Sequence, residues 1–176
     1  LDPPCWQMIE RLNDAVAYVH WLMDRDCKST SLKTLQGEIW QDGYRAGELK
    51  GAVFDDVPKA LERWSQRGRR TAIFSSGSVL AQKLLFANST AGDLTGFISA
   101  YFDTTLGSKT ESESYRRIAA AIGSPAPSMA FVSDVTKELA AARAAGMHAL
   151  LSVRPGNTPQ DESGQYPQIG TLLELP

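Results

Sequence analysis

Four polar side chains in this sequence have the types and the order that a phosphate-handling site needs. Ser75 and Ser76 directly follow an apolar stretch, and Asp134 lies at the end of a second one. Lys109 lies between them, just before a predicted helix start. Hydroxyl and backbone N–H groups bind phosphate oxygens, a lysine ammonium neutralises phosphoryl charge, and an aspartate can ligate Mg²⁺. Taken together, these residues predict a site for a phosphoryl group.

Each of these residues also has a structural interpretation, which the sequence leaves open. The serine run that ends at Ser78 is typical of a tight turn with a helix N-cap. Lys109 follows Gly107-Ser108 in a loop, where most lysines are simply solvated. Asp134 precedes a helix and could cap it. The order of the segments and their strand context favour the functional interpretation.

The elements that must position these side chains alternate between strands and helices. Strands are predicted at 71–74, 98–102, 129–132 and 148–153, with helices at 58–67, from 78, at 112–122 and at 136–145. Such alternation predicts right-handed crossovers and a parallel sheet, in which ligands bind beyond the carboxyl ends of strands. We therefore predict that Ser75, Lys109 and Asp134 converge on one cleft, within about 10 Å of one another.

The remaining segments differ in character from this alternating core. Residues 1–50 hold no strand candidate, and apolar residues three or four apart predict two amphipathic helices there, the second starting at Ser31. We expect a helical region at 1–50 and an α/β core at 51–176. A polar loop at 154–168 and a short terminal helix at 169–175 complete the prediction. Thr110 and Glu113 have the spacing of a capping box.

Composition narrows the classes of partner. The chain has 176 residues and a net charge of −2 with both signs interspersed, which argues against nucleic acid or an anionic membrane as the main partner. No apolar run is long enough to span a bilayer. Cys5 and Cys27 lack metal-like spacing and fit a reduced cytoplasmic compartment.

Several longer runs carry a resemblance to a known family. They include Leu-Gln-Gly-Glu-Ile-Trp at 35–40, Gly-Glu-Leu-Lys-Gly at 47–51, Ser-Ser-Gly-Ser-Val at 75–79, Tyr-Phe-Asp-Thr-Thr at 101–105, Ser-Asp-Val at 133–135 and Val-Arg-Pro-Gly-Asn at 153–157. On these runs the chain resembles the enolase-phosphatase, or acireductone synthase, family of the haloacid dehalogenase superfamily. The resemblance implies a Rossmann-like parallel sheet with a helical cap region.

The resemblance also implies an activity and roles for the four polar residues. The family is a Mg²⁺-dependent phosphatase of methionine salvage, which enolises and dephosphorylates 2,3-diketo-5-methylthiopentyl 1-phosphate to the acireductone. By match to its motifs, Ser75, Ser76 and Lys109 would bind the substrate, Lys109 and Asp134 would act in catalysis, and Asp134 would bind the metal. The implied partner is a phosphorylated small molecule, and the implied protein is a monomer.

One family motif finds no match. The family opens with a strand ending in Asp-Ile-Glu-Gly-Thr, which supplies the nucleophile, and residues 1–34 contain nothing similar. We therefore expect the first strand to be missing and the sheet to be incomplete between 71–74 and 129–132. The leading interpretation is a phosphatase that lacks its first segment in this sequence. The alternatives are a non-catalytic descendant that binds a phosphorylated metabolite or a protein, and a receiver-type phosphoacceptor domain, whose acidic cluster is absent.

Overall fold

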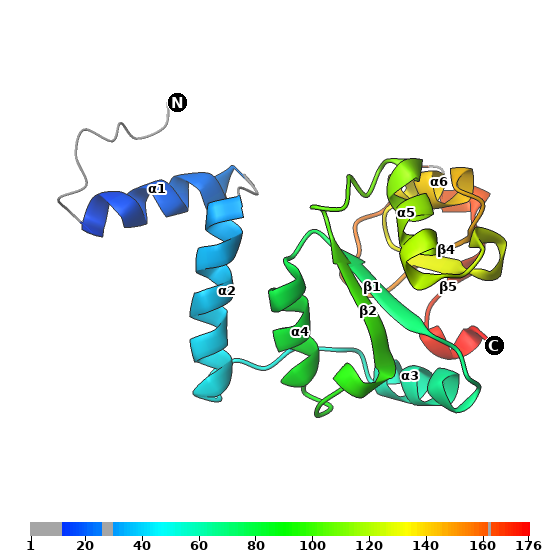
Figure 1. The fold of residues 1–176 in the computed structure, drawn as a ribbon, viewed down its shortest axis with the longest axis horizontal. Helices are drawn as coiled ribbons and strands as arrows, with labels where there is room; N and C mark the ends of the chain where they lie inside the picture. The colour runs from blue at the N-terminus through cyan, green and yellow to red at the C-terminus, as the bar shows by residue number, and fades with distance from the viewer. Residues whose placement is uncertain (1–11, 26–29, 162) are drawn as a thin grey trace.

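Two helices project away from an α/β unit in the computed structural model, which describes residues 12–25, 30–161 and 163–176 (Figure 1). They are α1 (Leu12–Asp24) and α2 (Thr30–Arg45). The start of the predicted first helix lies outside the described residues. The described residues up to 50 contain no strand, so that prediction is confirmed for them. Helix α2 contacts α4 (Val79–Ala87) of the α/β unit.

The α/β unit alternates helices and parallel strands as predicted. After α3 (Asp56–Gln66), its elements in chain order are β1 (Thr71–Ser75), α4, β2 (Ile98–Asp103), α5 (Ser112–Ile122), β3 (Ala130–Ser133), α6 (Thr136–Ala144), β4 (His148–Ser152) and β5 (Gln168–Ile169). Short 3₁₀ turns lie at Thr95–Phe97, Ala126–Ser128, Ser163–Gln165 and Leu172–Glu174. The predicted strands and helices agree with these bounds to within about two residues, which is the usual scatter at element ends.

The predicted terminal helix is wrong. Gln168 and Ile169 form strand β5, which pairs with β4 in parallel, and only Leu172–Glu174 turns helically. Thr171 and Glu174 form a capping box for this turn. The reason is that β4 has a free edge after β3 has taken the other, so the chain returns to pair with it rather than continuing as a helix.

The strands form two separate parallel sheets, not one continuous sheet. Strand β1 pairs with β2, and β3, β4 and β5 pair in that order. No ladder joins β1 to β3 among the described residues. Instead, the buried ring of Tyr115 from α5 makes edge contacts with Phe74 of β1 and Phe131 of β3, at centroid distances of 5.6 and 4.9 Å. The expected incomplete sheet between these two strands is therefore confirmed.

The buried core lies where α5 and α6 cover the second sheet. Tyr115 packs there with Ala119, Ala142 and Met147, and Leu139 packs with Leu151 and Tyr166. Leu139 and Ala142 of α6 are fully buried, as their spacing predicts. This packing fixes α6, whose first turn lies beside the predicted site.

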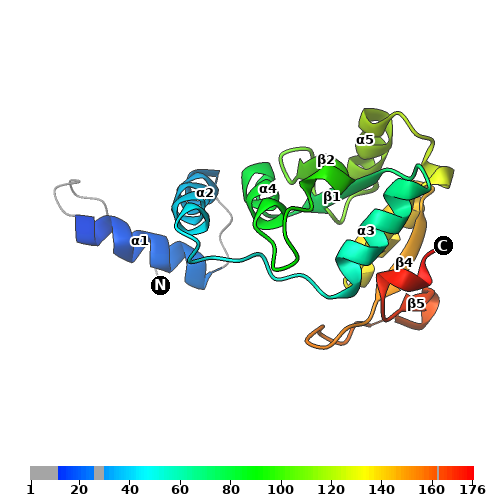
Figure 2. The ribbon, with the colours of Figure 1, turned by 90° about the horizontal axis from the view of Figure 1, so that it is seen from below.

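A buried ion pair between Asp56 and Arg154 ties α3 to the loop after β4, and further hydrogen bonds from Asp56 tie it to the C-terminal turn. The Asp56 carboxylate accepts both terminal N–H groups of Arg154 at 2.7 Å each. It also accepts the Thr171 hydroxyl at 2.8 Å and the Leu172 backbone N–H at 2.6 Å. Figure 2 shows α3 beside the C-terminal turn that carries Thr171 and Leu172. The hydrogen bonds from Arg154 hold the pKa of Asp56 well below its usual range.

We expect Asp56→Asn to destabilise the fold at neutral pH. Removing one member of a buried pair leaves the other charge uncompensated, which costs about 3 kcal/mol of unfolding free energy. Because the folded-state pKa of Asp56 is lowered, its contribution is complete above the usual aspartate pKa of about 3.9 and is lost as the pH falls through the lowered value. Urea unfolding of both proteins at pH 7 and in strong acid should show the difference shrinking in acid. Asp55→Asn changes an exposed neighbour without a side-chain cap bond and should be neutral.

Candidate active site

The serine loop is held rigidly at the carboxyl end of β1. Ser75 Oγ accepts the Gly77 backbone N–H at 3.1 Å, and Ser78 caps α4 by accepting the Ala81 N–H at 3.2 Å. The buried amide of Gln82 donates to the carbonyls of Gly77 and Phe102, both at 2.9 Å. The N-cap interpretation is therefore confirmed for Ser78.

Ser75 and Ser76 differ in what their hydroxyls do. The Ser75 oxygen already stabilises the turn, although its own proton can still be donated. The hydroxyl of Ser76 takes part in none of the hydrogen bonds that hold this loop within the described part of the chain, and the residue is half-buried. Ser76 is thus the serine of this loop best suited to donate to a phosphate oxygen.

Lys109 is paired, not simply solvated. Its ammonium lies 2.7 Å from Glu138 Oε2, with side-chain exposures of 22% and 11% for the two residues. Ser133 Oγ donates to the same carboxylate oxygen at 2.8 Å. Glu138, which sequence reasoning missed, therefore joins Lys109 to the end of β3. Its position in the first turn of α6, four residues after Asp134, was the available signal, because that turn follows directly on the end of β3, where ligands of a parallel sheet bind.

The backbone around Lys109 is fixed by α5. Tyr115 donates its hydroxyl to the Lys109 carbonyl at 2.7 Å, and burial together with nearby Glu138 raises the pKa of Tyr115. Gly107 has a φ of +152°, and a Cβ there would lie 2.4 Å from Ser114 Oγ, so only glycine fits. The Lys109 ammonium lies 6.0 Å from the ring centroid of Phe74, the residue before Ser75. Lys109 is thus held close to the ends of both β1 and β3.

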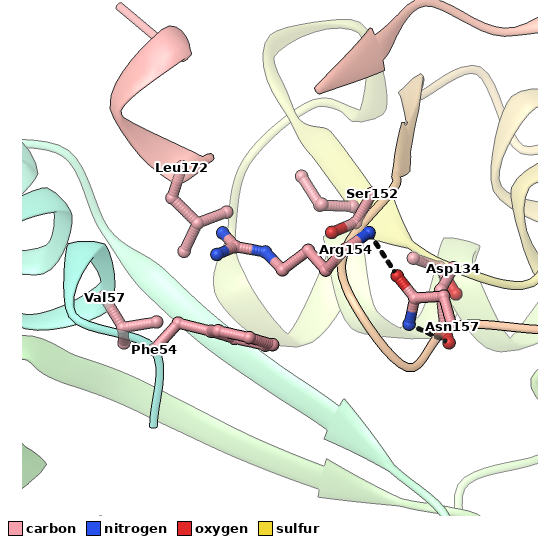
Figure 3. Close-up of a pocket in the computed structure, with 9 residues that line it drawn as sticks. Phe54, Val57, Asp134, Ser152, Arg154, Asn157 and Leu172 are labelled. Atoms are coloured by element: carbon pink, nitrogen blue, oxygen red, sulfur yellow. Dashed lines mark hydrogen bonds between the residues drawn. The ribbon is translucent and has the colours of Figure 1, made fainter. Parts of the chain in front are cut away.

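Asp134 faces a cavity of about 300 Å³ at the carboxyl end of β3 (Figure 3). The cavity is lined by Phe54, Val57, Val132, Ser133, Asp134, Ser152, Arg154, Asn157 and Leu172. Helix α6 has Val135 as its N-cap, with no side-chain cap bond, so the interpretation of Asp134 as a cap is wrong. The Asp134 carboxylate instead accepts the side-chain amide of Asn157 at 2.9 Å.

The structure links the four predicted residues in part. Lys109 reaches the residue before Asp134 through Glu138 and Ser133, and it lies near Phe74 beside Ser75. Neither Ser75 and Ser76 nor Lys109 line the cavity that Asp134 faces. Their convergence on one phosphoryl group stays a prediction.

The metal-binding capacity of this site rests on one carboxylate. Within the described ranges, no group of three or more His, Cys, Asp or Glu side chains is close enough to hold a metal ion. Asp134 keeps one oxygen that accepts no hydrogen bond from those residues. A single carboxylate beside a partly polar cavity fits Mg²⁺, which usually takes one or two carboxylates and fills its other positions with water and phosphate oxygens.

Comparison with known proteins defines the class to which this fold and site belong. The family model described as haloacid dehalogenase-like hydrolase matches residues 14–146. The chain therefore belongs to the haloacid dehalogenase-like hydrolases. A solved HAD phosphatase from Thermococcus onnurineus has the same fold, with a TM-score of 0.68, 20% identity, and coverage of 92% of this chain and 79% of that one.

Closer relatives place the chain in the enolase-phosphatase branch of that family. Enolase-phosphatase E1 of Synechococcus elongatus is 52% identical over 161 residues, which are 92% of this chain and 67% of the relative. The protein of the same name from Drosophila persimilis is 51% identical, covering 85% of this chain and 59% of that one. The chain thus spans only about three-fifths to two-thirds of the length of these relatives. The UTR4 protein of Saccharomyces cerevisiae aligns with a TM-score of 0.80 and 35% identity, over 92% of this chain and 75% of its own.

Proposed function

We propose that this chain is part of an Mg²⁺-dependent phosphatase of methionine salvage, which converts 2,3-diketo-5-methylthiopentyl 1-phosphate to the acireductone. The observation that carries the proposal is the partly buried Lys109–Glu138–Ser133 contact at the strand ends, in a chain about 50% identical to proteins named enolase-phosphatase E1. Those relatives are longer than this chain, so the substrate and the complete reaction are inferred from them.

In this proposal each residue has a separate task. Ser76 and the backbone N–H groups of the serine loop bind phosphate oxygens. Lys109 neutralises charge on the transferred phosphoryl group, and Glu138 holds the ammonium in place. Asp134 would hold Mg²⁺, which when bound supplies positive charge at the phosphoryl oxygens. An aspartate from the motif that this sequence lacks would be the nucleophile.

The same proposal gives the partner, the cofactor, the oligomeric state and the compartment that we expect for this enzyme. The partner is a small phosphorylated metabolite, the cofactor is Mg²⁺, the protein is a monomer and the compartment is the cytoplasm. The helical region at 1–50 would serve as the cap and the region at 51–176 as the phosphatase core. No helix among the described residues is long and apolar enough to cross a membrane.

The protein expressed from its own initiation codon should release phosphate from the diketo phosphate only when Mg²⁺ is present. Lys109→Met should lower kcat/KM by about 100-fold, because removing one pre-organised charge donor typically has an effect of this size. Lys137→Met removes an exposed lysine from the first turn of α6 and is the matched control. Enzyme-coupled phosphate detection on the three proteins makes the comparison.

Two outcomes would count against the proposal. If the expressed protein binds the diketo phosphate without hydrolysing it, the non-catalytic alternative replaces the phosphatase. If Lys109→Met and Lys137→Met behave alike, Lys109 is not part of the site.

A further inference from the structure

The side chain of Asn157 bridges the candidate metal ligand and the backbone of its own loop. Its Nδ2 group donates to Asp134 Oδ2 at 2.9 Å, and its Oδ1 accepts the Arg154 backbone N–H at 2.7 Å (Figure 3). The two ends of an amide are chemically different, so these two contacts fix which way it faces. The donor end can only point at Asp134.

The loop side of this bridge is itself anchored. The side chain of Arg154 is 9% exposed and paired with Asp56 by two 2.7 Å hydrogen bonds. The guanidinium also lies 4.5 Å from the ring centroid of Phe54. Because the buried pair holds Arg154, the backbone N–H that orients Asn157 is fixed to α3 and to the C-terminal turn.

The helix that follows Asp134, α6, gives its side chain no support. Asp134 lies between the end of β3 and Val135, the N-cap of α6, and makes no cap hydrogen bond. The hydrogen bond from Asn157 is the side-chain contact that the structure gives its carboxylate among the described residues. Without that bond, the Asp134 side chain would be free to populate several staggered rotamers.

We propose that Asn157 is a positioning residue, which locks Asp134 in one rotamer and leaves its second oxygen for a cation. Groups that orient a metal ligand commonly change metal affinity by 10- to 100-fold when they are removed. The cation part of this inference rests on the proposed function, whereas the rotamer part does not.

A pair of substitutions separates this role from a role in loop structure alone. Asn157→Asp keeps the size and the acceptor for the Arg154 N–H but loses the donor to Asp134. Asn157→Ala loses both contacts. Gln160→Ala is the matched control, because Gln160 lies in the same loop and accepts the Thr136 N–H of α6 at 3.3 Å without touching Asp134.

The first measurement is the three-bond NMR couplings across χ1 of Asp134, in residues 1–176 without added metal. The native chain and Gln160→Ala should show the couplings of one rotamer, whereas both Asn157 variants should show averaged values. A single Asp134 rotamer in the Asn157→Asp variant, with the loop intact, would overturn the proposal. Because this measurement involves no substrate, its result stands even if the protein hydrolyses no phosphate ester.

The second measurement is Mn²⁺ binding, followed by the paramagnetic relaxation of water, in the protein expressed from its own initiation codon. Asn157→Ala should weaken Mn²⁺ binding by about 10-fold, and Gln160→Ala should leave it unchanged. Equal affinities of the native protein and the Asn157→Ala variant would overturn the cation part of the inference.

Discussion

Residues 1–176 alone should release phosphate from the diketo phosphate, or from an aryl phosphate, no faster than their Asp134→Asn variant does. The family reaction needs a carboxylate nucleophile, and positioning groups without it leave most of the barrier in place. The acids that contact the site residues are already engaged. Glu138 holds Lys109 and Ser133, and Asp56 holds Arg154. We therefore expect a deficit of several orders of magnitude relative to a complete enzyme.

A phosphate-release assay with and without Mg²⁺ makes this comparison. The control is Asp161→Asn, which changes an exposed acid of the 154–168 loop and should have no effect. Mg²⁺-dependent release by residues 1–176 that Asp134→Asn abolishes would contradict the prediction. Such a result would mean that a carboxylate within these residues serves as the nucleophile.

The parallel α/β pattern could be predicted because each element carries a local signal. Buried residues such as Leu139 and Ala142 recur with helical spacing, and Ser78 has the residue type and position of an N-cap. The ends of β1 and β3 follow directly from where their apolar runs stop. Local patterns were sufficient to place Ser75 and Asp134 at strand ends.

Contacts between distant residues could not be predicted in the same way. Thr110 and Glu113 have capping-box spacing, yet Glu111 is the N-cap of α5, Thr110 contacts Ser108, and Glu113 pairs with Arg116. The start of α5 therefore depends on tertiary packing around Lys109 rather than on the local capping-box pattern.

The same limit explains why three site residues were missed. Glu138 and Tyr115 act through partners that the fold brings from other elements, and Asn157 lies in a polar loop without periodicity. A polar residue in such a loop has no sequence signal that separates a contact with Asp134 from ordinary exposure. Only the family-like run at 153–157 pointed to this loop.

The facing edges of β1 and β3 should accept one further strand. Strand β1 is paired only on its β2 side and β3 only on its β4 side among the described residues. Every residue of β1 and all but one of β3 are half-buried, whereas strands at the centre of an α/β sheet are usually covered. Unpaired N–H and C=O groups along such edges are costly when buried and reactive toward other strands when exposed. A slot one strand wide requires about 10 Å between the two strands.

A synthetic peptide with an apolar strand ending in Asp-Ile-Glu-Gly-Thr tests this expectation. At a concentration of about 100 times its dissociation constant, it should add about 2.7 kcal/mol to the unfolding free energy of residues 1–176. Hydrogen exchange should slow at alternate amides of β1 and β3, because a parallel neighbour pairs with every second residue. The same peptide with proline at its centre cannot complete the ladder and is the control.

Amides on these edges that are already protected without the peptide would mean that β1 and β3 pair with something else. If the amides of β1 and β3 exchange at the same rate with the strand peptide as with the proline peptide, the slot is closed by Tyr115 and its neighbours.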